Sequence, residues 1–192
     1  MPVTYSTMVP LGAQMPAFSL PDVSSGKTVS STELDPAKPV LVLFICAHCP
    51  FSKHIAPAIR RLARDYGERV NLLALSGNDI AQVPEDSPEG LKRLAQAFGF
   101  SAPFLYDQSQ TTVRAFGAEC TPECFLYDTD RKLVYRGEID ESRPGGRGEP
   151  MALPVRAALD AILSGADVSP NQKPGVGCNI KWRAATPAGA TR

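Results

Sequence analysis

Two cysteines stand where a reactive thiol is expected. Cys46 and Cys49 follow the apolar run 40–45 and directly precede a segment with helical periodicity. A helix N-terminus presents unpaired N–H groups and the positive end of the helix dipole, and both favour a thiolate. The spacing therefore predicts nucleophilic attack, disulfide exchange or reversible oxidation at sulfur.

Local sequence favours Cys49 over the earlier cysteine. Pro50 has no N–H and suits the first position of a helix, which makes Cys49 the N-cap. Its sulfur is then expected near the N–H groups of Phe51 and Ser52. An imidazole at His48 would help to hold a thiolate, although a solvated loop histidine is an equal alternative.

The paired cysteines also have two interpretations without redox chemistry. Cys46 and Cys49 could supply half of a zinc site, with Cys120 and Cys124 as the other half. They could also be inert, since free cysteine often packs as a small apolar residue. Cys120 and Cys124 flank Thr121-Pro122, a pair that a functional turn explains better than a zinc site does. We therefore expect no metal and no other cofactor.

Composition excludes several classes of partner. The 192 residues are 43% hydrophobic and 21% charged, with a formal net charge of zero, which is ordinary for a globular domain. Nothing in that balance points to nucleic acid or to a membrane surface. Five cysteines without an apparent secretory signal fit a reducing compartment, so we expect a cytoplasmic protein.

The order of expected elements predicts an α/β fold with a mixed sheet. We expect a short N-terminal hairpin across residues 25–26, strands at 40–46, 69–75 and 104–106, an antiparallel pair at 123–127 and 132–136, and helices at 50–66, 88–98, 109–116 and 153–163. Pro57 should kink the first helix. We divide the chain into a tail (1–14), one domain (15–165) and an irregular C-terminal extension (166–192).

Two segments resemble thioredoxin. Residues 42–57, V-L-F-I-C-A-H-C-P-F-S-K-H-I-A-P, are similar to V-D-F-W-A-x-W-C-G-P-C-K-x-I-A-P of that family. This resemblance sets Cys49 on the nucleophilic cysteine and Ser52 on the resolving one. Residues 116–127 resemble Y-G-I-R-G-I-P-T-L-L-L-F of the same family, and this match sets Pro122 on the family's cis-proline. The resemblance implies that the loop of this proline, which includes Thr121, docks substrate. The implied fold is a three-layer thioredoxin-like sandwich.

The chain as a whole resembles the peroxiredoxin-like redoxins of the alkyl hydroperoxide reductase and thiol-specific antioxidant family. Residues 12–22, G-A-Q-M-P-A-F-S-L-P-D, are similar to the opening G-x-x-A-P-x-F-x-L-x-D, and later segments resemble an uncharacterised branch. Peroxiredoxins carry P-x-x-x-[TS]-x-x-C, in which the hydroxyl orients peroxide. Counting back from Cys49, this chain has Val42 and Cys46 in those positions, so we expect weak peroxide reduction.

We therefore predict a thiol–disulfide oxidoreductase that works through a Cys49 thiolate. Its partners would be a protein or small-molecule disulfide or thiol and a cellular thiol reductant. The alternatives are a thiol peroxidase that acts on peroxide and a non-catalytic redox-sensing module. Ser52 cannot form a disulfide, so the resolving thiol must lie elsewhere, and we rank Cys46 first, Cys120 second and Cys178 third.

Overall fold

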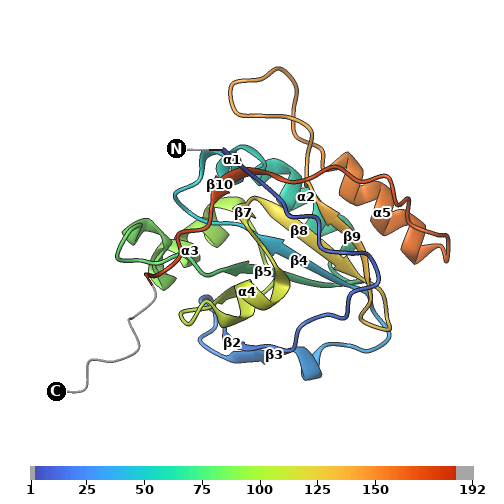
Figure 1. The fold of residues 1–192 in the computed structure, drawn as a ribbon, viewed down its shortest axis with the longest axis horizontal. Helices are drawn as coiled ribbons and strands as arrows, with labels where there is room; N and C mark the ends of the chain where they lie inside the picture. Colours follow the sequence, from blue (N-terminus) through green and yellow to red (C-terminus); the bar gives the residue numbers. More distant parts are fainter. Residues whose placement is uncertain (1–2, 185–192) are drawn as a thin grey trace.

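A five-stranded mixed sheet forms the centre of the computed structural model, which describes residues 3–184 (Figure 1). The strands are β4 (Val40–Phe44), β5 (Asn71–Ser76), β6 (Phe104–Tyr106), β8 (Glu123–Tyr127) and β9 (Leu133–Gly137), in the order β6–β5–β4–β8–β9. β4, β5 and β6 are parallel, and β8 is antiparallel to both of its neighbours. This arrangement confirms the predicted α/β class and the antiparallel pair at the edge of the sheet.

Elements on both faces of the sheet make three layers. One face packs against α2 (Ala56–Tyr66), α3 (Pro88–Phe98) and α5 (Leu153–Leu163). The other packs against α4 (Thr111–Phe116) and the hairpin of β2 (Ser19–Pro21) and β3 (Thr28–Ser30). All of β4 is buried because its alternate side chains enter the two cores, which explains its uninterrupted apolar sequence.

The helix that follows β4 is interrupted, as its sequence predicts. α1 spans Pro50–His54, Ile55 has non-helical backbone angles, and α2 begins at Ala56. Pro57 cannot donate a backbone hydrogen bond to the preceding turn, which accounts for the break. Ile59, Leu62 and Tyr66 are buried against the sheet, so α2 packs through one apolar face.

A second, three-stranded sheet joins the two ends of the chain to the main domain. β10 (Val176–Asn179) lies between β1 (Val3–Tyr5) and β7 (Cys120–Thr121), and both pairings are antiparallel. The expectation of an irregular C-terminal extension is therefore wrong over β10, because backbone pairing with distant strands orders a segment that has no periodicity of its own. The outermost parts of the predicted tail and extension, 1–2 and 185–192, lie outside the described residues.

Two short 3-10 helices complete the elements, at Ser31–Glu33 and at Pro84–Asp86. The second of these contributes to the site described below. Within the described part of the chain, no helix has both the length and the apolar character needed to cross a membrane.

Candidate active site

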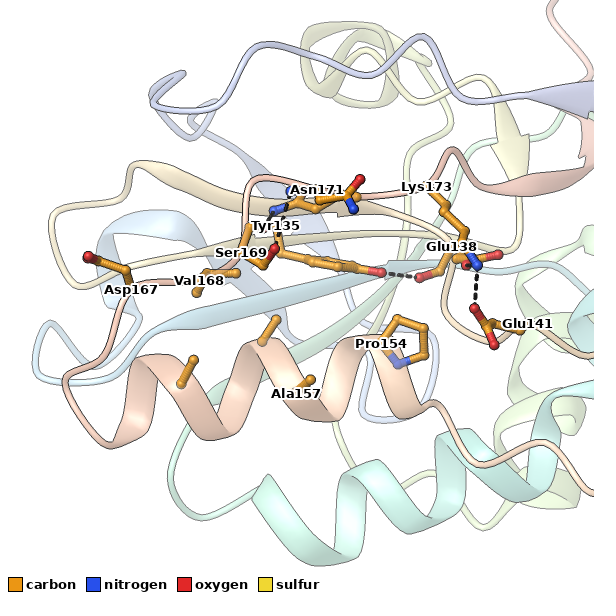
Figure 2. Close-up of a pocket in the computed structure, with 13 residues that line it drawn as sticks. Tyr135, Glu138, Glu141, Pro154, Ala157, Asp167, Val168, Ser169, Asn171 and Lys173 are labelled. Atoms are coloured by element: carbon orange, nitrogen blue, oxygen red, sulfur yellow. Dashed lines mark hydrogen bonds and ion pairs between the residues drawn. The ribbon is translucent and has the colours of Figure 1, made fainter.

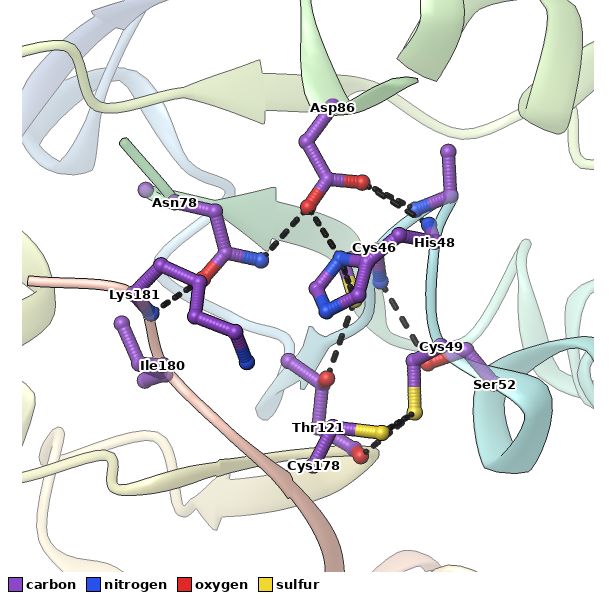
Figure 3. A network of polar contacts seen from close by, with 12 residues as sticks. Cys46, His48, Cys49, Ser52, Asn78, Asp86, Thr121, Cys178, Ile180 and Lys181 are labelled. Atoms are coloured by element: carbon purple, nitrogen blue, oxygen red, sulfur yellow. Dashed lines mark hydrogen bonds and ion pairs between the residues drawn. The ribbon is translucent and has the colours of Figure 1, made fainter. Parts of the chain in front are cut away.

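Cys49 is the N-cap of α1, as the position of Pro50 predicts. Its backbone is extended (φ −80°, ψ 121°), and Pro50 occupies the first helical position. No hydrogen bond from the first turn to this side chain has cap geometry, since Sγ turns towards the neighbouring strands, although the backbone N–H of Ser52 still helps to lower its pKa. It lies 3.1 Å from the carbonyl oxygen of Thr121 and 2.9 Å from Sγ of Cys178. The sulfur thus sits between the helix and the small sheet (Figure 3).

Cys46 lies two residues beyond β4 and is fully buried. Its Sγ is 3.0 Å from the hydroxyl oxygen of Thr121 and 3.4 Å from Nδ1 of His48. Its backbone N–H donates to the hydroxyl of Ser52, which ties the loop to α1. His48 therefore contacts Cys46 rather than Cys49, which differs from the arrangement that the sequence suggests.

Cys178 is carried to the site by β10. Its Cα pairs with those of Val3 and Thr121 on either side, which fixes the strand over α1. Gly177 makes this approach feasible, since a Cβ at that position would collide with the carbonyl oxygen of Thr121. The structure thus brings together Cys46, Cys49 and Cys178 in one cluster beside Phe51.

The remaining cysteines lie apart from this cluster. Cys120 is buried on β7, paired with Asn179, and makes no hydrogen bond to Cys49 among the described residues. Cys124 belongs to the core beneath α2 and α5, with its sulfur 3.7 Å from the carbonyl oxygen of Gly137. Burial raises the pKa of both thiols, so they are protonated at neutral pH.

The pKa of Cys49 is lowered to about 4, mainly by a hydrogen bond from the Cys46 thiol and further by one from Cys178, against the opposing effect of burial. Burial raises the pKa of Cys178 to about 12 and that of Cys46 well above its ordinary value. At neutral pH the cluster therefore holds one thiolate between two thiol donors. The nearby carbonyl of Thr121 opposes that charge, but the two donors outweigh it.

Asp86 organises the loop that carries these cysteines. It is fully buried on the 3-10 helix Pro84–Asp86. Its Oδ1 accepts from the backbone N–H groups of Ala47 (2.6 Å) and His48 (3.0 Å). Its Oδ2 lies 2.6 Å from Nδ1 of His48 and accepts from the Asn78 side chain at 2.7 Å. Burial alone would raise the pKa of Asp86, but these partners, the His48 side chain first, hold it below its ordinary value.

Sequence patterns did not identify Asp86 or Asn78. Both lie in the polar stretch after β5, where their residue types are common in solvated loops. Their burial depends on packing that only the folded chain shows. The one local signal was the Val83-Pro84 step, which favours an ordered turn ahead of the acidic pair Glu85-Asp86.

The substrate-docking prediction rests on Thr121 and Pro122. The peptide bond between these two residues is cis, as the resemblance to thioredoxin implies. β10 occupies the free edge beside β7 and covers Cys49, which has no exposed surface. A hollow of about 10 Å³, lined in part by Phe51, Pro122 and Val176, adjoins the cluster and has room for about one water molecule.

The cluster also contains side chains of the types that bind metal ions. Within residues 3–184, one group places ligand-type atoms within 4.8 Å of one another: Cys46, His48 and Asp86. The Asp86 oxygens already accept four hydrogen bonds. The four cysteines weighed for zinc do not form such a group in the described part of the chain.

A larger cavity lies elsewhere. It measures about 360 Å³ and opens between α5, β9 and residues 167–173 (Figure 2). Its lining includes Tyr135, whose hydroxyl donates to the carbonyl of Glu138, and an ion pair between Lys173 and Glu141. No cysteine or histidine lines it, so thiol chemistry belongs to the cluster around Cys49.

The sheet order, the helix that begins at Cys49 and the cis-proline define a thioredoxin-like fold. The thioredoxin domain of a thiol-disulfide oxidoreductase from Bacteroides vulgatus shares it, with a TM-score of 0.59, 19% identity and coverage of 77% of this chain and 96% of that one. The family model described as the AhpC/TSA family matches residues 11–136, so the chain belongs to the AhpC/TSA family.

Two relatives show how far this similarity extends. An uncharacterized conserved protein from Geobacillus kaustophilus is 43% identical, with a TM-score of 0.93 and coverage of 97% of this chain and 99% of that one. A Mycobacterium tuberculosis protein named "Putative peroxiredoxin" is 25% identical over 116 residues, which are 60% of this chain and 69% of its own. The chain is therefore a member of a thioredoxin-like redox family.

Proposed function

We propose that this protein is a thiol–disulfide oxidoreductase whose nucleophile is the Cys49 thiolate. The observation that carries the proposal is the position of Cys49 at the N-terminus of α1, with its Sγ 2.9 Å from that of Cys178, and hydrogen bonds from Cys46 and Cys178 lower its pKa to about 4. The thiolate is the reactive form of cysteine, and at pH 7 nearly all of Cys49 is in that form. Family membership and the cis-proline beside the nucleophile support the same reading.

The reaction proceeds by two exchanges. The Cys49 thiolate attacks one sulfur of a substrate disulfide, forms a mixed disulfide and releases the other sulfur as a thiolate. A second protein thiol, once its proton has gone to that leaving thiolate or to water, attacks Sγ of Cys49 and releases the reduced substrate. Two electrons pass from the protein to the substrate, and a cellular thiol reductant restores both cysteines.

We propose Cys178 as the resolving thiol. Its sulfur lies 2.9 Å from that of Cys49, whereas Cys120 makes no hydrogen bond to the nucleophile in the described part of the chain. Cys46 acts as a hydrogen-bond donor to the thiolate, with the Thr121 hydroxyl donating to it in turn at 3.0 Å. These contacts support Cys178 as the first candidate in place of Cys46, which sequence spacing favours.

Access to Cys49 requires that β10 move, because the nucleophile is fully buried beneath it. The Thr121-Pro122 edge of β7 would then be free to pair with an extended substrate chain. The substrate class that fits is a disulfide in an extended peptide or a small disulfide, and neither nucleic acid nor a membrane is required. The buried, unpaired cysteines suit a reducing compartment, so we propose a cytoplasmic location.

Peroxide reduction is the second candidate, and the peroxiredoxin name of the mycobacterial relative favours it. In that reaction the Cys49 thiolate attacks one oxygen of the peroxide and becomes a sulfenic acid. The O–O bond breaks, and the other oxygen leaves as an alcohol or as water. The resulting sulfenic acid then condenses with the Cys178 thiol and loses water. The position of the usual peroxide-orienting hydroxyl is occupied by Cys46, so we expect this reaction to be the slower one.

Parallel assays separate these functions. With dithiothreitol as reductant, the wild-type protein should reduce insulin disulfides faster than it consumes hydrogen peroxide. Cys49→Ser should abolish insulin reduction, while Cys120→Ser, a matched change at another buried cysteine, should retain it. Equal activity of the Cys49→Ser protein would contradict the proposal. Rapid peroxide consumption without insulin reduction would establish the peroxidase instead, and inactivity in both assays would favour a redox-sensing module.

A further inference from the structure

A continuous chain of hydrogen bonds joins the C-terminal strap, defined here as residues 174–182 and including β10, to the cysteine loop. The backbone N–H of Lys181 donates to Oδ1 of Asn78 at 2.8 Å. The Nδ2 of Asn78 donates to Asp86, which in turn binds the backbone and the ring of His48. Figure 3 shows these residues between the strap and the cysteines.

We propose that Asp86 is a positioning residue of the thiol site and that Asn78 links it to the strap. Asp86 sets the loop that presents Cys46 to Cys49, and the same network seats the segment that carries Cys178. The inference rests on the proposed function, because it concerns the regulation of the same thiolate.

Asp86 anchors the cysteine loop at Ala47 and His48, the two residues between Cys46 and Cys49. A buried carboxylate requires several donors, and all four of its partners lie either in this loop or on Asn78. The His48 ring is held through Nδ1 alone, since Nε2 is buried and has no hydrogen-bond partner in the described structure. Without Asp86, the backbone of Ala47 and His48 and the His48 ring would lose these hydrogen bonds.

Asn78 connects this anchor with the strap because both ends of its amide are used. One end donates to Asp86 and the other accepts from Lys181, three residues after Cys178. Loss of the amide would therefore loosen Asp86 and the strap together. Other contacts also hold the strap, including the Gln110 side chain, which donates to the carbonyl of Lys181 at 2.8 Å.

Positioning and simple electrostatics predict opposite changes at the nucleophile. The titratable groups next to Cys49 are the thiols of Cys46 and Cys178. Further groups act on these thiols or on Cys49 from the surrounding elements: His48 and Asp86 beside Cys46, Lys181 on the strap, Cys120 on β7 and Glu123 on β8. Removal of a nearby negative charge would by itself make the thiolate easier to form. Loss of the Cys46 donor geometry would make it harder. The sign of the change therefore distinguishes the two roles.

The test uses three variants of the full chain. Asp86→Asn removes the charge with little change in shape, and Asn78→Ala breaks the link to the strap. Asp79→Asn is the matched control: it removes one carboxylate charge near the strap, where Asp79 pairs with Arg183, without touching His48. For each reduced protein, the rate of Cys49 alkylation by iodoacetamide is followed against pH, and the rate of Cys178 labelling is followed by mass spectrometry.

We expect Asp86→Asn to raise the midpoint of Cys49 alkylation by about one pH unit, which reduces the thiolate fraction about tenfold at pH values well below the wild-type midpoint. Asn78→Ala should also raise the midpoint and speed Cys178 labelling severalfold, and Asp79→Asn should do neither. An unchanged or lower midpoint in Asp86→Asn would overturn the inference, as would equal effects in Asp79→Asn. If Asp86→Asn does not fold, Asn78→Ala decides alone. Alkylation and labelling rates do not depend on enzyme turnover. A wild-type midpoint near pH 4 that stays unchanged in all variants would therefore reject the role of Asp86 and Asn78 but leave the proposed function intact.

Discussion

Replacement of Cys46 by alanine should raise the pKa of Cys49 by roughly one to two units. The Cys46 thiol is the largest cause that lowers this pKa, which is about 4 in the intact site. A hydrogen bond to a charged group contributes about 1.5–3 kcal/mol, and about 1.4 kcal/mol corresponds to one pKa unit. The pKa of Cys49 in Cys46→Ala should therefore be roughly 5–6, because the second donor, Cys178, remains.

The assay is the rate of iodoacetamide alkylation of Cys49 between pH 3 and 9, resolved by peptide mass spectrometry. At pH 5 the thiolate fraction should fall from about nine-tenths in the wild type to between about half and one-tenth in Cys46→Ala. Cys46→Ser is the matched control, because its hydroxyl can still donate, and it should keep most of the lowered pKa. An unchanged midpoint in Cys46→Ala would refute the argument that this thiol stabilises the thiolate.

Three further changes test the strap, the buried carboxyl and the core. Gly177→Ala should speed Cys178 labelling severalfold in the reduced protein, because the new methyl group collides with Thr121; unchanged labelling would contradict the tight pairing. Burial raises the pKa of Glu123 to about 7 from 4.5, so stability from this group falls as pH rises between those values. Glu123→Gln should remove that decline, which urea unfolding at pH 4 and pH 8 would measure. Leu62→Ala should cost about 2–5 kcal/mol in urea unfolding. The exposed Leu153→Ala should cost less than about 0.5 kcal/mol, and similar losses would count against the packing described.

Local sequence was sufficient to predict the main elements of the fold. The run that forms β4, the proline at the start of α1 and the break before α2 depend on neighbouring residues, and the structure confirms all three. The edge pair of β8 and β9 was equally clear, since a turn separates two segments with strand character. The likeness to thioredoxin added the cis bond at Pro122, which no local rule could establish.

The site was only partly predictable because its other half comes from distant segments. β10 has the sequence V-G-C-N, too short and too small in its side chains to show a strand pattern. Its order depends on pairing with β1 and β7, and this pairing is what brings Cys178 to Cys49. Asp86 likewise looks like any acidic loop residue until its burial under the cysteine loop is known.

Disulfide mapping of the oxidised protein tests the central proposal most directly. The reduced protein would be treated with one equivalent of diamide, quenched in acid, digested without reduction and analysed by mass spectrometry. If Cys49 is the nucleophile and Cys178 the resolving thiol, the dominant disulfide-linked peptide should join these two residues. The Cys178→Ser protein should instead retain a mixed disulfide at Cys49 when glutathione disulfide is supplied. A dominant Cys46–Cys49 or Cys49–Cys120 peptide in the wild type would contradict the assignment.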